Sequence, residues 1–354
     1  MIRNQMSMPP TGVRSPRMET LRPAHGLPAS SRLRVGLVLA AALQVFVQTA
    51  QVARAADEYP LRPITLVNAS TPGAGGDLTS RVIGAALTRE LGQPIIVINR
   101  AGAAGNLAME SVARAAPDGY TLLVGFTGHV INPGLFKKLP FDPVADFTPI
   151  SFLAANMNLL VVRNDLPARS VKELISMARS SPGKLTIGSY AGTSQHLAGA
   201  LFNTMAGIDV LNVPYKNSTD PWNDLLAGRI DYVFATYNLA KPAVDAGKLR
   251  VLGIADTQRS ILMPDIPPIS DTVPGYSARG WYGLFGPAGM PRAVTLKLHA
   301  TLARALKTND VKDKLVGMGS EPLASGSPEQ FAEFIKTEIP RWSKVIREAG
   351  IEPQ

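Results

Sequence analysis

The sequence has no cysteine and only four histidines among its 354 residues. The absence of cysteine excludes disulfide bonds, thiol catalysis and zinc sites built on cysteine ligands. Aromatic residues account for 6% and charged residues for 18%, whereas 45% are hydrophobic. This is the composition of a globular protein, and it excludes disorder or a coiled coil for the chain as a whole. At about 100–200 residues per domain, the length predicts about two domains.

The motifs of several enzyme classes are also missing. There is no G-x-S-x-G nucleophile elbow, no G-x-x-x-x-G-K-[ST] phosphate loop, no G-x-G-x-x-G dinucleotide fingerprint and no H-E-x-x-H motif. No residues have the spacing of metal ligands, so we expect neither a metal nor another cofactor. A hydrolase that uses Ser194 with His129 or His196 stays open as an alternative, although Ser194 and His196 are too close in sequence to indicate a catalytic triad by themselves. We therefore expect a protein that is not an enzyme.

The formal net charge of +9 is concentrated at the N-terminus. Residues 1–55 hold seven arginines and one acid and contribute +6, which leaves +3 for the rest of the chain. This small excess is not clustered, so nucleic acid is not an expected partner.

The N-terminal segment has the pattern of a secretory signal peptide. Arg32 and Arg34 precede a 13-residue apolar run over 35–47, and the small-x-small triplet 53–55 follows it. Because a helix needs about 20 residues to cross a bilayer, a retained membrane anchor is the less favoured alternative. We expect residues 1–55 to be a signal peptide with a long basic n-region, cleaved near Ala55, and the mature protein to reside in the periplasm.

Hydrophobic patterning after residue 56 predicts an α/β protein. Short β-type runs alternate with amphipathic helices, and a βαβαβ order with short connections predicts a parallel sheet covered by helices. In this first part, strands are expected at 64–67, 94–98 and 120–124, and helices at 78–91 and 106–115.

A second set of alternating elements begins near residue 159. The proline-rich stretch 263–275 is typical of a connector, and the strand 281–285 is expected to return to the first sheet. Two helices follow, at 293–307 and after Ser327, and Pro340 is expected to kink or interrupt the second. In the second set, strands are expected at 159–162, 184–187, 209–213, 231–234 and 251–255, and helices at 171–178, 197–206, 222–226 and 239–246.

Two glycine-rich loops, 70–77 and 99–106, connect predicted strands to predicted helices. In a parallel sheet both loops lie at the carboxyl ends of strands, where α/β proteins place ligands. Glycine allows close approach of the backbone, and the unpaired N–H groups at a helix start attract anions without a basic side chain. We expect Asp77 to be the helix N-cap. The loops are predicted to clamp a carboxylate with the backbone of Thr71, Gly73, Ala74, Gly75, Gly76, Gly102, Ala103, Ala104 and Gly105.

Further candidates follow two other predicted strands. Thr193 and Ser194, between a strand and a helix of the second set, can cap that helix and also hydrogen-bond a ligand. His196 enters the first turn of the same helix, where a structural role is expected. His129 lies just beyond the strand 120–124 and is a candidate to face the ligand.

At these loops the sequence resembles the substrate-binding receptors of tripartite tricarboxylate transporters, the Bug family of periplasmic solute-binding proteins. The resemblance extends from Tyr59 to Gly350. Its markers are Pro-Gly-Ala-Gly-Gly-Asp at 72–77 with Arg81, Leu-Gly-Gln-Pro at 91–94, Asn-Arg at 99–100 through Asn106, Pro-Asp-Gly-Tyr at 117–120, Asp-Phe-Thr-Pro-Ile at 146–150, Gly-Thr-Ser-Gln-His-Leu at 192–197, Val-Pro-Tyr-Lys at 213–216, Gly-Lys-Leu-Arg at 247–250 and Trp-Tyr-Gly-Leu-Phe at 281–285.

The resemblance implies a Venus-flytrap fold, like that of periplasmic binding proteins, in which two α/β lobes close on a ligand. Each lobe would be a mostly parallel sheet covered by helices, with lobe 1 formed by 56–157 and 281–354 and lobe 2 by 158–280. A small organic carboxylate would be held by backbone amides and ordered water from the loops at 71–77 and 100–106. From lobe 2, contacts would come from Tyr190, Thr193, Ser194, Thr236 and Tyr237.

The resemblance also implies a role. The receptor, expected to be a monomer, would deliver its ligand to the membrane permease subunits of a tripartite tricarboxylate transporter. A sensory protein that presents the ligand to a signalling receptor is the alternative, because both roles need the same closing cleft.

Two departures from the family pattern bear on the ligand. Tyr190 stands where the family often has glycine, and it would narrow the cleft or stack on a ring. Ala235 stands where the family frequently has an aspartate available to an ammonium group. The second departure weakens the case for an amino acid and favours a plain or aromatic carboxylate.

Overall fold

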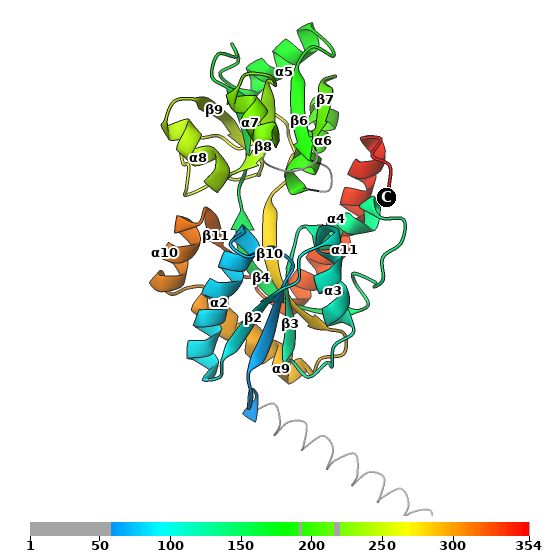
Figure 1. The fold of residues 1–354 in the computed structure, drawn as a ribbon, viewed down its shortest axis with the longest axis vertical. Helices are drawn as coiled ribbons and strands as arrows, with labels where there is room; N and C mark the ends of the chain where they lie inside the picture. Colours follow the sequence, from blue (N-terminus) through cyan, green and yellow to red (C-terminus); the bar gives the residue numbers. More distant parts are fainter. Residues whose placement is uncertain (1–57, 191–192, 216–219, 354) are drawn as a thin grey trace, which may run out of the picture. The chain divides into compact units, whose positions relative to one another are not determined.

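The larger of two sheets begins with β1 (Ile64–Asn68), which is buried on both faces as expected for the interior of a parallel sheet (Figure 1). β1 pairs in parallel with β2 (Ile95–Asn99) and β3 (Thr121–Phe126), which confirms the predicted βαβαβ order. The predicted signal peptide lies outside the described residues. The computed structural model describes residues 58–190, 193–215 and 220–353.

Three antiparallel strands complete this sheet, which is therefore mixed rather than mostly parallel. β10 (Gly280–Pro287) pairs with β3 and with β4 (Phe147–Asn156), and β11 (Ser320–Pro322) pairs with β4. The sequence does not predict β4, because Pro149 lacks the N–H group that a strand interior normally donates. The register against β10 shifts next to Pro149, so the proline sits at a β-bulge.

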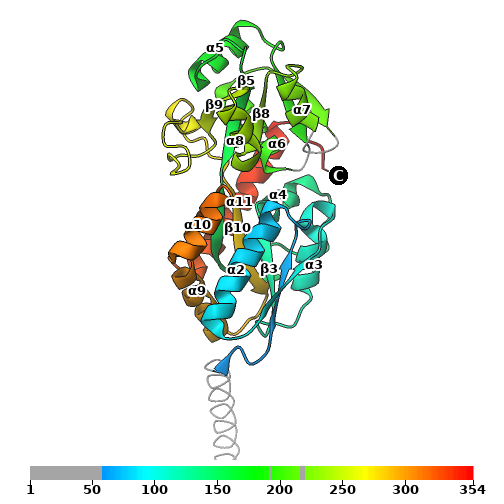
Figure 2. The same ribbon diagram turned by 60° about the vertical axis from the view of Figure 1, so that its left-hand side comes forward.

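Helices cover both faces of this sheet (Figure 1, Figure 2). On one face Ile83, Leu87 and Leu298 pack with Leu66 in a single hydrophobic cluster. The part of the chain that contains this sheet is called lobe 1 below. Its helices are α2 (Gly75–Leu91), α9 (Arg292–Ala305) and α10 (Asn309–Gly317) on that face, and α3 (Asn106–Ala113), α4 (Gly128–Leu135) and α11 (Pro328–Glu348) on the other.

The last helix, α11, is not interrupted at Pro340. It runs from Pro328 to Glu348 as one helix, so the expected interruption is wrong, while the alternative of a kink stays a prediction. Pro340 lies on the exposed side, while Phe331, Trp342 and Ile346 on both sides of it are buried in the same core. The packing of one continuous buried face of α11 therefore outweighs the loss of the backbone hydrogen bond that Pro340 cannot donate.

The second sheet, which defines lobe 2, is also mixed. Its strand order is β7-β6-β8-β5-β9, with β6 parallel to β7 and β8, and with β5 antiparallel to β8 and β9. Helices α5 and α6 pack in the cluster that contains Phe202 and Phe234, and α7 and α8 pack with Trp222 and Val233 on the other face. The elements are β5 (Asn158–Arg163), α5 (Val171–Ser180), β6 (Thr186–Tyr190), α6 (Ser194–Ala206), β7 (Leu211–Tyr215), α7 (Asp220–Leu226), β8 (Tyr232–Thr236), α8 (Tyr237–Asp245) and β9 (Leu249–Ile254).

No helix within the described ranges has the length and apolarity needed to cross a membrane. The chain leaves the first sheet after Asn156, enters the second at Asn158 and returns at Gly280.

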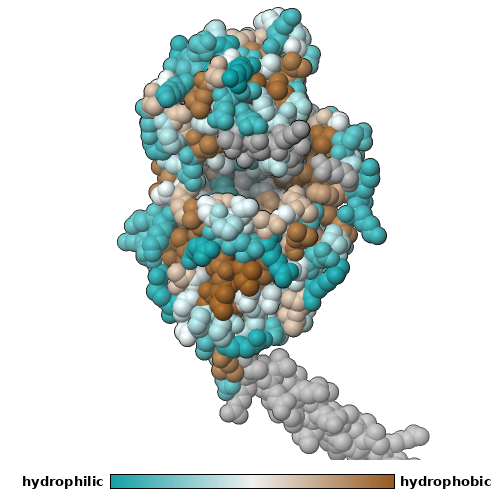
Figure 3. Space-filling view, in the orientation of Figure 1, coloured by the Kyte–Doolittle hydropathy of each residue, from teal (hydrophilic) through white to brown (hydrophobic). Residues whose placement is uncertain are grey.

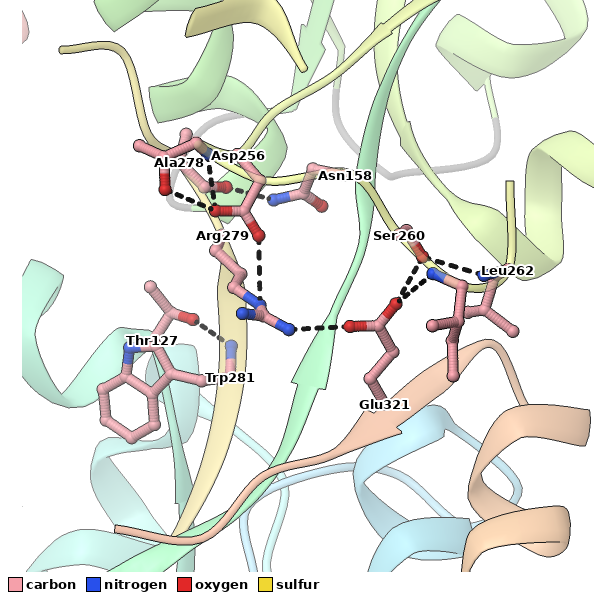
Figure 4. A network of polar contacts seen from close by, with 11 residues as sticks. Thr127, Asn158, Asp256, Ser260, Leu262, Ala278, Arg279, Trp281 and Glu321 are labelled. Atoms are coloured by element: carbon pink, nitrogen blue, oxygen red, sulfur yellow. Dashed lines mark hydrogen bonds and ion pairs between the residues drawn. The ribbon is translucent and has the colours of Figure 1, made fainter. Parts of the chain in front are cut away.

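A polar network joins the two lobes beside these crossings (Figure 4). The Arg279 guanidinium lies between two carboxylates, 3.3 Å from Asp256 Oδ2 and 2.9 Å from Glu321 Oε2. Glu321, on β11, also accepts hydrogen bonds from the Ser260 hydroxyl and from the Ile261 N–H at 3.2 Å. A lobe 1 side chain thus holds a lobe 2 segment and the returning chain together.

We predict that Glu321→Gln destabilises the protein by about 1 kcal/mol, because it removes a charge-assisted bond while keeping the size of the side chain. Urea unfolding would measure the loss. The matched control is Glu348→Gln at the C-terminal end of α11, whose ion pair with Lys344 is exposed, with 47% and 68% of the two side chains accessible; it should not lower the free energy of unfolding. Equal effects from both variants would contradict this role of the network.

Candidate functional site

Two adjoining cavities lie between the lobes, and Figure 3 shows the molecular surface hollowed there. The first, called the Thr127 cavity, has a volume of about 540 Å³, and the second, called the Trp222 cavity, of about 520 Å³. Both volumes are in the range of small-molecule sites. The two cavities meet at residues that line both of them, namely Tyr190, Thr193, Gln195 and Thr236.

Helices from both lobes begin at these cavities. Each of them follows a strand of one of the two sheets, so their N-termini gather where those strands end. A helix N-terminus carries a partial positive charge and unpaired N–H groups. The lining residues at these positions are Ala74 before α2, Ala103 and Ala104 in the turn before α3, Thr127 before α4, Thr193 before α6 and Thr236 before α8.

The lining of the two cavities includes no lysine or arginine among the described residues, and its one acid is the exposed Glu352. Most of the helix ends also lack a side-chain cap: Thr193 Oγ1 accepts the His196 N–H at 3.2 Å, whereas Ala74, Thr127 and Thr236 make no such bond. Backbone N–H groups therefore supply the positive potential of this site, and an anion is the ligand that they suit.

The loop before α2 is held by Asp77, although Asp77 is not the N-cap that the sequence predicts. Helix α2 begins at Gly75 with Ala74 as N-cap, and the Asp77 carboxylate reaches back to accept the Gly73 N–H at 2.8 Å. Asn99 Nδ2 donates to Asp77 Oδ1 at 2.9 Å, and Arg81 Nε donates to Asp77 Oδ2 at 3.1 Å.

The Asp77 carboxylate is ionised under ordinary conditions. Burial alone would raise its pKa, but the hydrogen bonds from Arg81, Gly73 and Asn99 outweigh burial and lower the pKa to about 2. An ionised carboxylate in the first turn of α2 offsets part of the positive charge at that helix end.

The loop before α3 has a strained backbone. Ala103 and Ala104 have φ angles of 46° and 53°, in the left-handed region that residues with a side chain rarely adopt. Asn132, a buried residue of α4, donates from Nδ2 to the Ala104 carbonyl at 3.0 Å and to Asn106 Oδ1 at 2.7 Å. At Gly105, with φ of 87°, a Cβ would lie 2.6 Å from the Phe126 ring. The neighbours of this loop thus fix a conformation that it would not prefer by itself.

The structure brings most of the predicted non-glycine residues together. The five predicted glycines lie outside the lining of both cavities, and their contact with a ligand stays a prediction; they shape the loops, since a Cβ on Gly76 would lie 2.2 Å from Ser70 Oγ. The predicted residues that line a cavity are Thr71, Ala74, Ala103, Ala104, Tyr190, Thr193, Ser194 and Thr236.

Two predicted residues lie elsewhere. His129 is fully buried, donates from Nε2 to the Pro143 carbonyl at 2.7 Å and stacks on Phe285, and burial lowers its pKa to about 4. Its expected place facing the ligand is wrong, because α4 begins at Gly128 and turns the next side chain into the core. Tyr237 packs against Gly319 of lobe 1 and does not line either cavity.

Several lining residues were not predicted from the sequence. Thr127 and Gly128 occupy the position expected for His129, and Trp281 lines the same cavity. Asn158, which is buried, accepts a hydrogen bond from Gln195 Nε2 at 3.0 Å and donates from Nδ2 to the Ala278 carbonyl at 2.9 Å. The only sign of this role of Asn158 in the sequence is that an asparagine stands at the start of a hydrophobic strand.

We predict that Asp77→Asn costs at most about 2.5 kcal/mol of stability at pH 7, because one pKa unit corresponds to about 1.4 kcal/mol. The folded-state pKa of about 2 lies below the ordinary value of 3.8. The stabilisation is therefore complete above about pH 4 and is lost as the pH falls toward 2. Urea unfolding of both proteins between pH 7 and pH 3 would follow the difference.

Asp245→Asn is the matched control, because the ion pair of Asp245 with Lys241 is exposed. This change should leave the free energy of unfolding unaltered. If Asp77→Asn lowers the free energy of unfolding as much at pH 3 as at pH 7, the ionised carboxylate of Asp77 is not the stabilising group.

Comparison with known proteins identifies the fold and the family of this chain. The R. palustris protein Rpa4515 with adipate has 36% sequence identity and a TM-score of 0.71, with 84% of this chain and all of that chain covered. MatC from Rhodopseudomonas palustris with bound malate has 33% identity and a TM-score of 0.66, over 81% of this chain and all of that chain. The periplasmic binding protein BugD has 27% identity and a TM-score of 0.69 over 84% of this chain and all of that chain, so the two-lobed α/β fold is that of periplasmic binding proteins.

The family model described as "Tripartite tricarboxylate transporter family receptor" matches residues 79–351. A UPF0065 protein from the tcbD-tcbE intergenic region of Pseudomonas sp. strain P51 is 36% identical over 82% of this chain and 88% of its own length. Protein BugT of Bordetella pertussis is 31% identical over 88% of this chain and 97% of its own length. The chain belongs to the tripartite tricarboxylate transporter receptor family, to which the Bug proteins also belong, and is a solute-binding receptor.

Proposed function

We propose that the chain captures a small organic carboxylate between its lobes and delivers it to the membrane permease of a tripartite tricarboxylate transporter. The observation that carries the proposal is the gathering of helix N-termini on two cavities whose described lining has no lysine or arginine. A carboxylate suits such a site, because its two oxygens accept several N–H groups at once. The adipate and malate in the two related structures support this ligand class.

Binding and lobe closure are coupled in this proposal. The turn before α3 and the start of α4 belong to lobe 1, whereas the starts of α6 and α8 belong to lobe 2. A carboxylate that is bound by the helix starts of both lobes has all of its hydrogen-bond partners only when the lobes are together. Binding therefore shifts the protein toward the closed state. The closed receptor is then the form that the permease recognises.

In this proposal the N-terminal segment directs the export of the protein. Residues 1–55 act as a cleaved signal peptide, and the mature receptor works in the periplasm as a monomer without a cofactor.

A catalytic role has less support. Ser194 would need a histidine as general base. The His129 Nε2 donates to Pro143, and the Nδ1 atoms of both His129 and His196 are buried without a hydrogen-bond partner in the described part of the chain. His129 is therefore not arranged to activate Ser194, and no hydrogen bond joins His196 to Ser194 within the described residues.

We predict that Ser194→Asp lowers carboxylate affinity more than 100-fold. Two like charges about 5 Å apart cost about 3 kcal/mol at an effective dielectric constant of about 20. Ser194 is the first residue of α6 and lines the Thr127 cavity. An acid at a helix start favours the helix, so the variant should fold. Titration calorimetry with a panel of straight-chain, dicarboxylic and aromatic acids would measure affinity, and thermal unfolding would check the fold.

Ser194→Asn is the matched control, because it has the shape of the aspartate without its charge and should stay within about tenfold of the unchanged protein. A panel in which no carboxylate binds the unchanged protein would refute the proposed ligand class. Carboxylate binding that survives Ser194→Asp would move the anion away from the α6 N-terminus.

A further inference from the structure

The C-terminal end of α11 lies against lobe 2, although the helix begins in lobe 1 (Figure 1, Figure 2). At its start the Phe331 ring packs on the lobe 1 rings of Phe152 and Phe285, with centroid separations of 4.4 and 5.0 Å. Along its length α11 contacts α4 of lobe 1 and α6 of lobe 2. The helix therefore joins the two lobes by packing, in addition to the strand crossings after Asn156 and before Gly280.

The residues that follow α11 form a defined turn. Gly350 has a φ of 63°, its N–H donates to the Arg347 carbonyl at 3.1 Å, and the Ile351 N–H donates to the Ile346 carbonyl at 3.1 Å. This pair of bonds is the Schellman motif, in which the residue after the left-handed glycine packs back on the helix. Ile351 packs on the hydrophobic cluster that contains Ile346. The way in which the helix ends therefore fixes the position of the Ile351 side chain.

Ile351 forms part of the wall of two cavities. One is the Thr127 cavity, and the other, called the α6 cavity, has a volume of about 210 Å³. Among the described residues that line the α6 cavity, only Ala349 and Ile351 come from lobe 1, and all the others belong to lobe 2. The segment 349–352, called the tail below, thus closes a space on the surface of lobe 2 and one end of the Thr127 cavity.

The tail lies beside the helix whose N-terminus reaches the Thr127 cavity. This helix is α6, with Thr193 as its N-cap and Ser194 as its first residue, and both residues line that cavity. A helix moves as a rigid unit, so a contact on the side of α6 also sets the place of its N-terminus relative to the helix starts of lobe 1. The α6 residues that line the α6 cavity have the spacing of one helix face, namely His196, Ala200, Asn203 and Thr204.

We propose that Ile351 is a positioning residue for ligand binding: through its place beside α6 it holds the α6 N-terminus next to lobe 1 and stabilises the closed state. This inference rests on the proposed receptor function. The contact between the tail and lobe 2 is made when the lobes are together and is lost when they separate. It therefore favours closure by the same factor whichever acid is bound.

Ile351→Asn tests this role by titration calorimetry with hexanoate, succinate, adipate and benzoate. Full burial of an isoleucine side chain is worth more than about tenfold in an equilibrium constant, and Ile351 is partly buried, so a loss of about fivefold is expected. The loss should be equal for every acid that binds the unchanged protein, because a smaller closed population multiplies each dissociation constant by the same factor. A substitution is preferred to a truncation, since a truncation would also remove Glu352, whose charge opposes an anion in the same cavity.

Two variants are the controls for this change. Ile351→Val keeps an apolar side chain and should stay within about twofold of the unchanged affinity. Leu296→Asn removes apolar surface elsewhere in lobe 1, because Leu296 is 41% exposed on α9 and lines none of the three cavities. It should leave the affinity unaltered, and thermal unfolding would check that each variant is folded.

A second pair of variants displaces the tail without changing Ile351. A Cβ at Gly350 would meet no atom within 4 Å, so a substitution there acts chiefly through the backbone. Asparagine adopts the left-handed region far more readily than a β-branched residue does. Gly350→Val should therefore weaken binding about as much as Ile351→Asn, whereas Gly350→Asn should retain most of the affinity.

The outcomes separate this inference from the receptor function. Acids that bind Ile351→Asn as tightly as the unchanged protein would overturn the inference and leave the receptor function standing. A loss that is larger for adipate than for succinate would also overturn it, because Ile351 would then act as a direct contact of the ligand. Equal affinities of Gly350→Val and Gly350→Asn would contradict the role of the helix end. If no acid binds the unchanged protein, both proposals are wrong.

Discussion

The positive charge at a helix N-terminus fades within about one turn, so a site made from such charges works only where several helices begin together. Parallel strand–helix units achieve this, since their helices start at the same edge of the sheet. Here two sheets present such edges to the same pair of cavities. The mixed strand order does not disturb the arrangement, because the antiparallel strands β10 and β5 lie beside the parallel units and not within the strand–helix connections.

The loops at this edge need support, because their conformations are not favourable by themselves. Asp77 and Asn99 hold the loop before α2, and Asn132 holds the left-handed pair Ala103 and Ala104. These supporting groups are buried or partly buried polar groups whose hydrogen bonds stay within lobe 1. A rigid backbone cradle spends no binding energy on ordering itself when a ligand arrives. This support also affects the electrostatics of α2, because the Asp77 carboxylate that orders the loop reduces the positive charge at the N-terminus of that helix.

Much of this fold follows from local sequence. The alternation of apolar runs predicts most of the strands and helices, and the glycine-rich loops mark the edge of the sheet where the cavities lie. What local sequence does not contain is the effect of tertiary packing. Strand β4 is not predicted because it contains Pro149, whose bulge depends on a partner strand that is distant in sequence. The continuity of α11 across Pro340 is not predicted because it depends on the packing of the buried face of α11 against other elements. The prediction for His129 is wrong by one residue, because the start of α4 decides which side chain turns into the core. Trp222 carries no local signal for the cavity that it lines, and the only local signal of Asn158 is its place at the start of a hydrophobic strand.

The lack of lysine and arginine in the described lining has a kinetic consequence. Salt screens interactions between exposed charges over about 8 Å at physiological ionic strength, whereas a carboxylate bound by backbone N–H groups is held at hydrogen-bond distance in a partly enclosed space. Capture by such a site depends little on the surrounding salt. The same absence means that the described lining adds no lysine or arginine to the long-range field that acts on an approaching anion. Diffusion and the opening of the lobes then set the rate of encounter, and the backbone of a few loops sets how long the ligand stays.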